Sequence, residues 1–181
     1  MEAVLAEHFK ARDKVRPMEY KLWEHDHSSN VKYFSPAELQ QRRLVLKDGK
    51  LYDAAGRPID TMVRDAAGRP KVATNADGKP LEKNGQPVYE QRTLLYVMDA
   101  SGEFYVTLDE AGLKHSSLLR GAAGAAAGVM QVVDGKLSLI NNLSGHYLPE
   151  KSYLEQATTQ LRQQGIAVAP EMVEAGGGVA W

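Results

Sequence analysis

Short apolar runs separated by glycine-containing turns dominate the middle of this chain, and they constrain its fold more than any other feature. Asp48-Gly49, Asp99-Ala-Ser-Gly102 and Asp134-Gly135 each stand between two such runs. An Asp-Gly pair between apolar runs is a strong signal for a β-hairpin, because glycine readily adopts the positive φ that a tight turn needs. The pattern predicts antiparallel hairpins around these turns, and hence a β meander.

Helical patterns lie on both sides of this meander. Residues 1–22 carry apolar side chains near helical spacing, and Ser35-Pro36 with Glu38 has the form of a capped helix start. Near the C-terminus, apolar residues spaced three and four apart precede Gly165, which suits the residue after a helix end. The predicted fold class is α+β, an antiparallel β meander with short flanking helices at both ends.

A turn-forming hexapeptide repeats between the first two hairpins. Asp-Ala-Ala-Gly-Arg-Pro occupies residues 53–58 and 65–70, and looser copies follow at 75–80 and 83–87. Each copy places proline after the glycine turn, and proline cannot donate a hydrogen bond to a ladder. We expect residues 53–87 to form short hairpins or an exposed loop on one edge of the sheet. A solvated connector is favoured over a functional role for this stretch.

The expected organisation has four parts: an N-terminal helical segment at 1–43, turn-rich hairpin repeats at 44–90, a core at 91–168 and a flexible tail at 169–181. The absence of cysteine excludes disulfides, a thiol nucleophile and thiolate metal sites. The chain has 22 basic and 23 acidic residues, so a nucleic-acid partner is not expected. No apolar run approaches the roughly 18 residues of a membrane span, so no membrane partner is expected either.

Reactive side chains concentrate in two segments, Lys114–Ser117 and Asn141–Tyr147. If the hairpin between them returns to where it began, both segments emerge at one end of the sheet. Histidine titrates near neutral pH, and a serine beside it forms the minimal nucleophile pair. The predicted catalytic residues are therefore His115, His146, Tyr147 and Ser116, and the predicted ligand-binding residues are Ser117, Arg120, Asn142, Ser144 and Gly145.

Structural explanations compete with this site. The histidines and serines can instead cap strand ends and satisfy backbone groups. The small residues of Gly121–Gly128 permit close packing of a strand or helix, or form the floor for a planar ligand beside Arg120. His25-Asp26-His27 lacks a spaced third ligand, so no metal site is predicted.

Four motifs together resemble a known domain: YVMDASGEFYV, HSSLLRGAAGAAAG, VVDGK and SGHYLP. Their order and spacing over residues 91–165 are similar to a domain of the plant IQM calmodulin-binding proteins and to modules of bacterial polymorphic toxins and secreted effectors. The resemblance implies a site at His115–Ser117 and Ser144–Tyr147. The sequence has no IQ motif, so calmodulin binding does not carry over.

Two functions are consistent with these observations. The first is a bacterial effector or toxin domain that transfers a group to a target, specifically ADP-ribosyl from NAD, exported by a signal-less route or held in the bacterial cytoplasm before export. Its expected partners are a host or competitor target protein and a cognate immunity or chaperone protein. The alternative is a non-catalytic protein-binding module that uses the surface of the two motifs.

Overall fold

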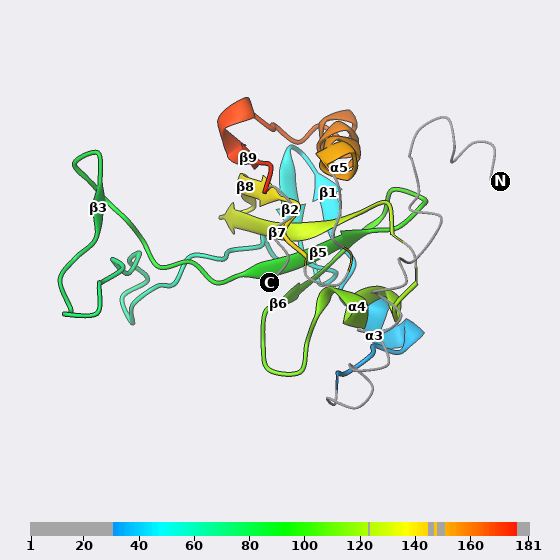
Figure 1. Cartoon of the computed structure of the whole chain (residues 1–181), viewed down its shortest axis with the longest axis horizontal. Helices are drawn as coiled ribbons and strands as arrows, with labels where there is room; N and C mark the ends of the chain where they lie inside the picture. Colours follow the sequence, from blue (N-terminus) through cyan, green and yellow to red (C-terminus); the bar gives the residue numbers. More distant parts are fainter. Residues whose placement is uncertain (1–30, 123, 145–146, 148–150, 177–181) are drawn as a thin grey trace.

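The computed structural model describes residues 31–122, 124–144, 147 and 151–176. Figure 1 shows the arrangement of the elements. The helices are α3 (Pro36–Gln40), α4 (His115–Leu119), α5 (Lys151–Gln163) and the short 3-10 helix η1 (Pro170–Met172). The strands are β1 (Val45–Lys47), β2 (Lys50–Tyr52), β3 (Glu82–Lys83), β4 (Gln86–Pro87), β5 (Leu94–Met98), β6 (Phe104–Leu108), β7 (Ala126–Val133), β8 (Lys136–Asn141) and β9 (Val173–Glu174). The predicted helix in 1–22, His25–His27, Gly145 and His146 lie outside the described residues.

A five-stranded sheet forms the centre of the fold, in the order β6-β5-β7-β8-β9. Every neighbouring pair is antiparallel except β8 and β9, which are parallel. The register of β7 on β8 shifts between Gln131 and Val132, which marks a β-bulge. The predicted α+β fold class is confirmed, because a largely antiparallel sheet carries short helices before and after it. The strand order differs from that of a simple meander, since β7 pairs with β5 and not with β6, the strand that precedes it in the chain.

Each face of the sheet has its own core. On one face, α5 and the β1–β2 hairpin contribute Leu154, Leu161 and Leu51 to a cluster with Tyr96 and Met130 of the sheet. On the other face, α4 and the residues around α3 cover the sheet. They form a second cluster with it, which includes Phe34, Leu118, Val97, Tyr105 and Tyr147. Figure 1 shows α5 and α4 on opposite sides of the sheet. Burial of these side chains is the main favourable contribution to folding.

Four of the predicted turns share one geometry. In each copy a side-chain oxygen accepts the backbone N–H groups two and four residues later, as in an Asx turn. The accepting residues are Asp53, Asp65, Asn75 and Asp99. Three residues later stands a glycine with φ between 75° and 86°. The copies of the repeated sequence that begin at Asp53, Asp65 and Asn75 therefore form the same hydrogen-bonded turn.

Residues 62–91 form a slender projection, here called the arm, which extends away from the sheet (Figure 1). Isolated bridges hold its two sides together, Met62 with Gln91 and Val72 with Tyr89, and the β3–β4 hairpin forms its far end. Most arm residues from 66 onward are exposed. Of the two forms expected for 53–87, the structure has the short hairpins, which are closed by bridges of Tyr52 with Pro58, Arg64 with Pro70 and Thr74 with Pro80.

Two segments differ in secondary structure from the pattern-based expectation. His115–Ser117 was expected at a strand end, but these residues begin helix α4. The apolar pattern of a five-residue helix is too short to distinguish helix from strand. Residues 170–174, in the segment expected to be a flexible tail, form η1 and β9. Among the described residues, no helix has the length and apolar character needed to cross a membrane.

Candidate functional site

His115 lies inside the fold. The residue is only 6% exposed, and its Nε2 lies 2.7 Å from the Gly128 carbonyl oxygen of β7. A carbonyl oxygen only accepts, so the imidazole carries its proton on Nε2 and donates it. Ser116 and Ser117 are buried as well, and the Ser117 hydroxyl accepts the Lys114 backbone N–H at 2.9 Å. The histidine therefore joins α4 to the central strand β7.

The second motif segment also bonds to backbone. Asn141 Oδ1 accepts the N–H groups of Val129 and Leu143, at 2.9 and 3.0 Å. Asn142 Oδ1 accepts the Gly176 N–H at 3.0 Å and so holds the segment after β9. Both asparagine side chains are buried. These amides connect β7, the end of β8 and the C-terminal segment.

Ser144 and Tyr147 continue this arrangement. The Ser144 hydroxyl accepts the Tyr147 N–H at 3.3 Å, and the Tyr147 hydroxyl donates to the Ala122 carbonyl at 2.8 Å. Arg120 ends α4 in the left-handed conformation, with φ 52°, and is exposed. The structure thus places the described predicted residues in one region, where most of them bond to backbone groups: His115, Ser117, Asn142, Ser144 and Tyr147. Their catalytic and ligand-binding roles stay predictions.

Gly128 brings the two motif segments together. A Cβ added to Gly128 would overlap the Asn141 carbonyl oxygen and lie 2.9 Å from the Asn142 Cα. The small residues thus permit close approach of backbone here, which was the structural alternative for this stretch. Tyr96 lies opposite Gly128 in the β5–β7 register, and its hydroxyl donates to that same Asn141 carbonyl at 2.8 Å.

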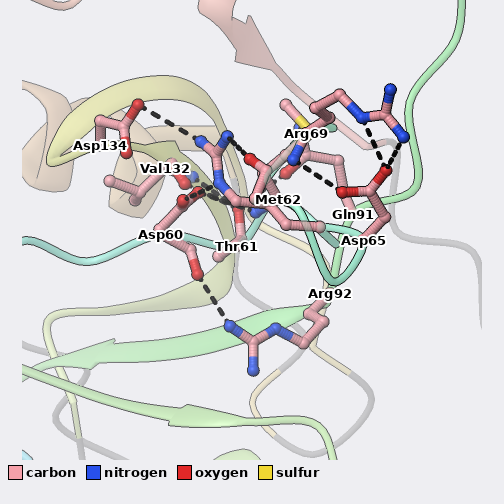
Figure 2. Close-up of polar contacts among 11 residues, drawn as sticks. Asp60, Thr61, Met62, Asp65, Arg69, Gln91, Arg92, Val132 and Asp134 are labelled. Carbon is pink, nitrogen blue, oxygen red and sulfur yellow. Dashed lines mark hydrogen bonds and ion pairs between the residues drawn. The ribbon is translucent and has the colours of Figure 1, made fainter. Parts of the chain in front are cut away.

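A different polar cluster lies where the arm leaves the sheet (Figure 2). Thr61 is 1% exposed and bonds to Val132 of β7, at the point where the register of β7 on β8 shifts. The Thr61 N–H donates to the Val132 carbonyl at 2.7 Å, and the Thr61 hydroxyl accepts the Val132 N–H at 2.9 Å. The Thr61 carbonyl accepts the Arg92 N–H at 2.7 Å. Thr61 therefore anchors both sides of the arm to the sheet.

We expect Thr61→Val to loosen this anchor. Valine keeps the shape of threonine but leaves the buried Val132 N–H without its acceptor, which costs about 2 kcal/mol of unfolding free energy. Urea unfolding measures this loss. Thr74→Val is the control, because Thr74 is exposed on the arm and should change stability by less than about 0.5 kcal/mol. Equal stability of the two variants would contradict the anchoring role.

Ion pairs surround this anchor. Asp60 Oδ2 accepts Arg64 Nε at 2.8 Å, and Arg64 also lies 3.3 Å from Asp134 in the β7–β8 turn. Partial burial raises the pKa of Asp60, but bonds from Arg64 and from the Met62 N–H outweigh it and hold the pKa below its usual value. Arg92 Nη2 donates to the Asp60 carbonyl at 2.9 Å. Asp60 is therefore ionised at neutral pH.

A groove of about 560 Å³, here called the base groove, lies between the foot of the arm and strand β6. Four arginines and two aspartates contribute its charged groups, and apolar residues of β5 and β6 contribute to its wall. Its lining residues are Gln41, Arg42, Arg43, Asp53, Arg57, Pro58, Ile59, Asp60, Thr61, Arg92, Leu94, Val106, Thr107 and Leu108. The groove thus combines positive charge with apolar surface.

The sequence analysis did not identify this groove. Arg57 was visible only as part of a repeated turn, where it pairs with Asp53 four residues earlier. Arg42 and Arg92 stand 50 residues apart in the sequence, and only the fold brings them to one groove. The sequence feature that could have indicated the groove is the pair of arginines that flank the arm, Arg57 before it and Arg92 after it.

Comparison with known proteins finds sequence similarity to plant proteins. Residues 67–154 match the family model of the IQ motif-containing protein middle domain. IQ domain-containing protein IQM1 of Arabidopsis thaliana is 32% identical over 94 residues, which cover 50% of this chain and 19% of that protein. IQM3 and IQM4 of the same plant are 27% and 24% identical, each over 75% of this chain. The chain spans only about a fifth to a quarter of the length of these relatives. No solved structure matches.

These similarities correct three expectations. The bacterial toxin or effector function, ADP-ribosyl transfer and export by a signal-less bacterial route are wrong, because the matched relatives are plant IQ domain-containing proteins. The expectation of NAD as a cofactor stays a prediction, now without the reaction that motivated it. The similarity to IQM proteins that the motifs predicted is confirmed: residues 67–154 resemble the middle domain of IQ motif-containing proteins.

Proposed function

We propose that this chain is a non-catalytic protein-binding module that contacts its partner through the base groove. The observation that carries the proposal is the contrast between the two polar regions. His115 and Asn141 are buried and bonded to backbone groups of β7, whereas the base groove opens to solvent with charged side chains on both walls. Groups that hold a sheet together contribute stability, and exposed charged and apolar groups remain available to a partner.

The similarity to IQ domain-containing proteins also supports a protein-binding function. The relatives are larger proteins in which this segment is one part, and a protein partner is the function class that they favour. The surface differs from the one expected from sequence, since the serines of the first motif are buried. The expected toxin target, immunity and chaperone proteins depended on the toxin reading and are not proposed.

Cross-linking in an extract of the source organism, followed by mass spectrometry, tests this proposal. The wild-type chain, Arg92→Glu and Arg120→Glu serve as bait. Arg92 lines the base groove, whereas Arg120 is exposed at the end of α4 beside the motif serines. We expect a protein that is recovered with wild type and Arg120→Glu and reduced about tenfold with Arg92→Glu, because reversal of an interfacial charge opposes complementarity.

Two outcomes would contradict the proposal. Loss of the partner with Arg120→Glu alone would place the contact at the motif segment instead of the groove. Recovery of no specific protein by any of the three forms would remove the binding function itself. Melting temperatures within about 2 °C of wild type establish that both variants are folded, since exposed substitutions change stability little.

A further inference from the structure

One half of the outer edge of β6 lies beside another segment of the chain. The Leu44 N–H donates to the Phe104 carbonyl at 2.8 Å, and the Val106 N–H donates to the Arg42 carbonyl at 2.9 Å. Residues 42–44 thus pair with the first half of β6, and Arg43 forms a bridge with Tyr105. Before Arg42 the chain turns away into α3.

The second half of this edge, from Val106 to Leu108, has no neighbouring strand among the described residues. The Asp109 N–H bonds to the Thr93 carbonyl, which shows that odd-numbered residues here point their backbone groups toward the β5 side. The backbone N–H and C=O groups of even-numbered residues therefore point away from β5, as the Val106 N–H does when it donates to the Arg42 carbonyl. The next outward groups are the Val106 carbonyl and the Leu108 N–H. No strand of the described part of the chain pairs with them, and both residues line the base groove.

Positive charge borders this open edge. The Arg42 guanidinium donates to the Thr107 hydroxyl at 3.1 Å and stacks over the Phe34 ring, with 3.9 Å between its central carbon and the ring centre. The Arg92 guanidinium donates to a backbone carbonyl. Within the described residues, neither arginine has a carboxylate at ion-pair distance. These two guanidinium groups can therefore take carboxylates from another molecule.

The acidic residues of the groove do not cancel this charge. Asp53 is engaged by Arg57 at 2.8 Å, and Asp60 is engaged by Arg64, also at 2.8 Å. Each aspartate is thus neutralised by an arginine of its own. The groove keeps a positive surplus beside a strand edge whose Val106 carbonyl and Leu108 N–H have no strand partner within the described residues.

We propose that the base groove binds an extended acidic segment of a partner protein, which adds to β6 at Val106–Leu108 and sets its carboxylates against Arg42 and Arg92. This inference rests on the proposed function and names the chemistry of the partner. Strand addition supplies main-chain hydrogen bonds, and pockets for alternate side chains supply specificity. A nucleic acid offers negative charge but has no peptide N–H and C=O groups for a strand edge.

A synthetic peptide tests the inference without a known partner. The probe is a fluorescein-labelled octapeptide of alternating glutamate and threonine, which places all carboxylates on one side of an extended strand. Its binding to the whole chain is measured by fluorescence anisotropy at low ionic strength. We expect saturable binding, about tenfold weaker with Arg92→Glu, and no binding of the matching lysine–threonine peptide.

The repeated turn offers a closely matched pair of variants. Arg57 and Arg69 occupy the same position of identical hexapeptides, each paired with the aspartate four residues earlier, with side chains 80% and 78% exposed. Only Arg57 lines the base groove. We expect Arg57→Glu to weaken peptide binding at least about fivefold and Arg69→Glu to weaken it less than twofold.

Strand addition has its own readout. Methylation of the peptide nitrogens at alternate residues keeps the charge but removes the hydrogen bonds to one side, so we expect binding to weaken about tenfold for one of the two methylation patterns. In nitrogen-15 NMR spectra, the Leu108 amide should shift on addition of the unmodified peptide. A single-stranded oligonucleotide of the same charge should not shift it.

Each result decides between the alternatives. Equal loss with Arg57→Glu and Arg69→Glu, or an oligonucleotide that binds as well as the peptide, would reduce the effect to general electrostatic attraction and overturn the inference. Failure of the peptide to bind, while a protein is still captured in an Arg92-dependent way, would overturn the acidic-strand inference and leave the proposed function intact. Loss of that capture as well would overturn both.

Discussion

Gly128→Ala is expected to cost about 4 kcal/mol of unfolding free energy, or roughly 8–16 °C in melting temperature. The added Cβ would overlap the Asn141 carbonyl oxygen and lie 2.7 Å from its carbon. Both are backbone atoms, so no side-chain rotation relieves the clash. The strand ends that Asn141 and Tyr96 hold must move instead, and their hydrogen bonds lengthen.

Urea unfolding followed by circular dichroism measures this effect. Gly124→Ala is the control, because it makes the same change two residues before β7, where the nearest atoms to the added Cβ are 3.3 Å away and one of them ends the Leu119 side chain. We expect it to cost less than about 1.5 kcal/mol. If Gly128→Ala were as stable as Gly124→Ala, the close approach of the two motif segments would be refuted.

His115→Ala should cost about 3 kcal/mol, or roughly 6–12 °C in melting temperature. The substitution removes a buried ring and leaves the Gly128 carbonyl without its donor. Lys114→Ala, at the preceding exposed position, should leave the melting temperature nearly unchanged.

Differential scanning fluorimetry distinguishes this structural role from a catalytic one. A catalytic histidine that is not needed for the fold is expected to leave stability intact when it is replaced. A His115→Ala variant that melts at the wild-type temperature would therefore contradict the structural role and make His115 a candidate catalytic residue again.

The local features of this fold were predictable from sequence because they depend on a few adjacent residues. Asp48-Gly49 and Asp134-Gly135 fixed two hairpin turns, each with both residues at positive φ. Ser35 and Glu38 formed the expected capping box, with Ser35 accepting the Glu38 N–H at 3.2 Å. The apolar residues spaced three and four apart before Gly165 are Leu154, Ala157 and Leu161, and all three lie in the core.

The candidate site was not predictable in the same way. The motif residues were identified by their chemistry, and sequence alone did not show that the fold uses His115 and Asn141 to bind backbone. The base groove depends on distant residues, since Arg42, Arg57 and Arg92 come to one groove only because the foot of the arm packs beside β6. Side-chain pattern determines each hairpin, but the position of a groove depends on how the hairpins pack.

The central claim is that a protein partner contacts the base groove, while the motif segment serves as internal support. Hydrogen–deuterium exchange of the chain, with and without its recovered partner, tests this claim most directly. We predict slower exchange on binding for residues 57–61 and 106–108 and unchanged exchange for 115–120 and 141–144. Protection confined to 115–120 and 141–144 would contradict the claim and place the binding surface at the motif segment.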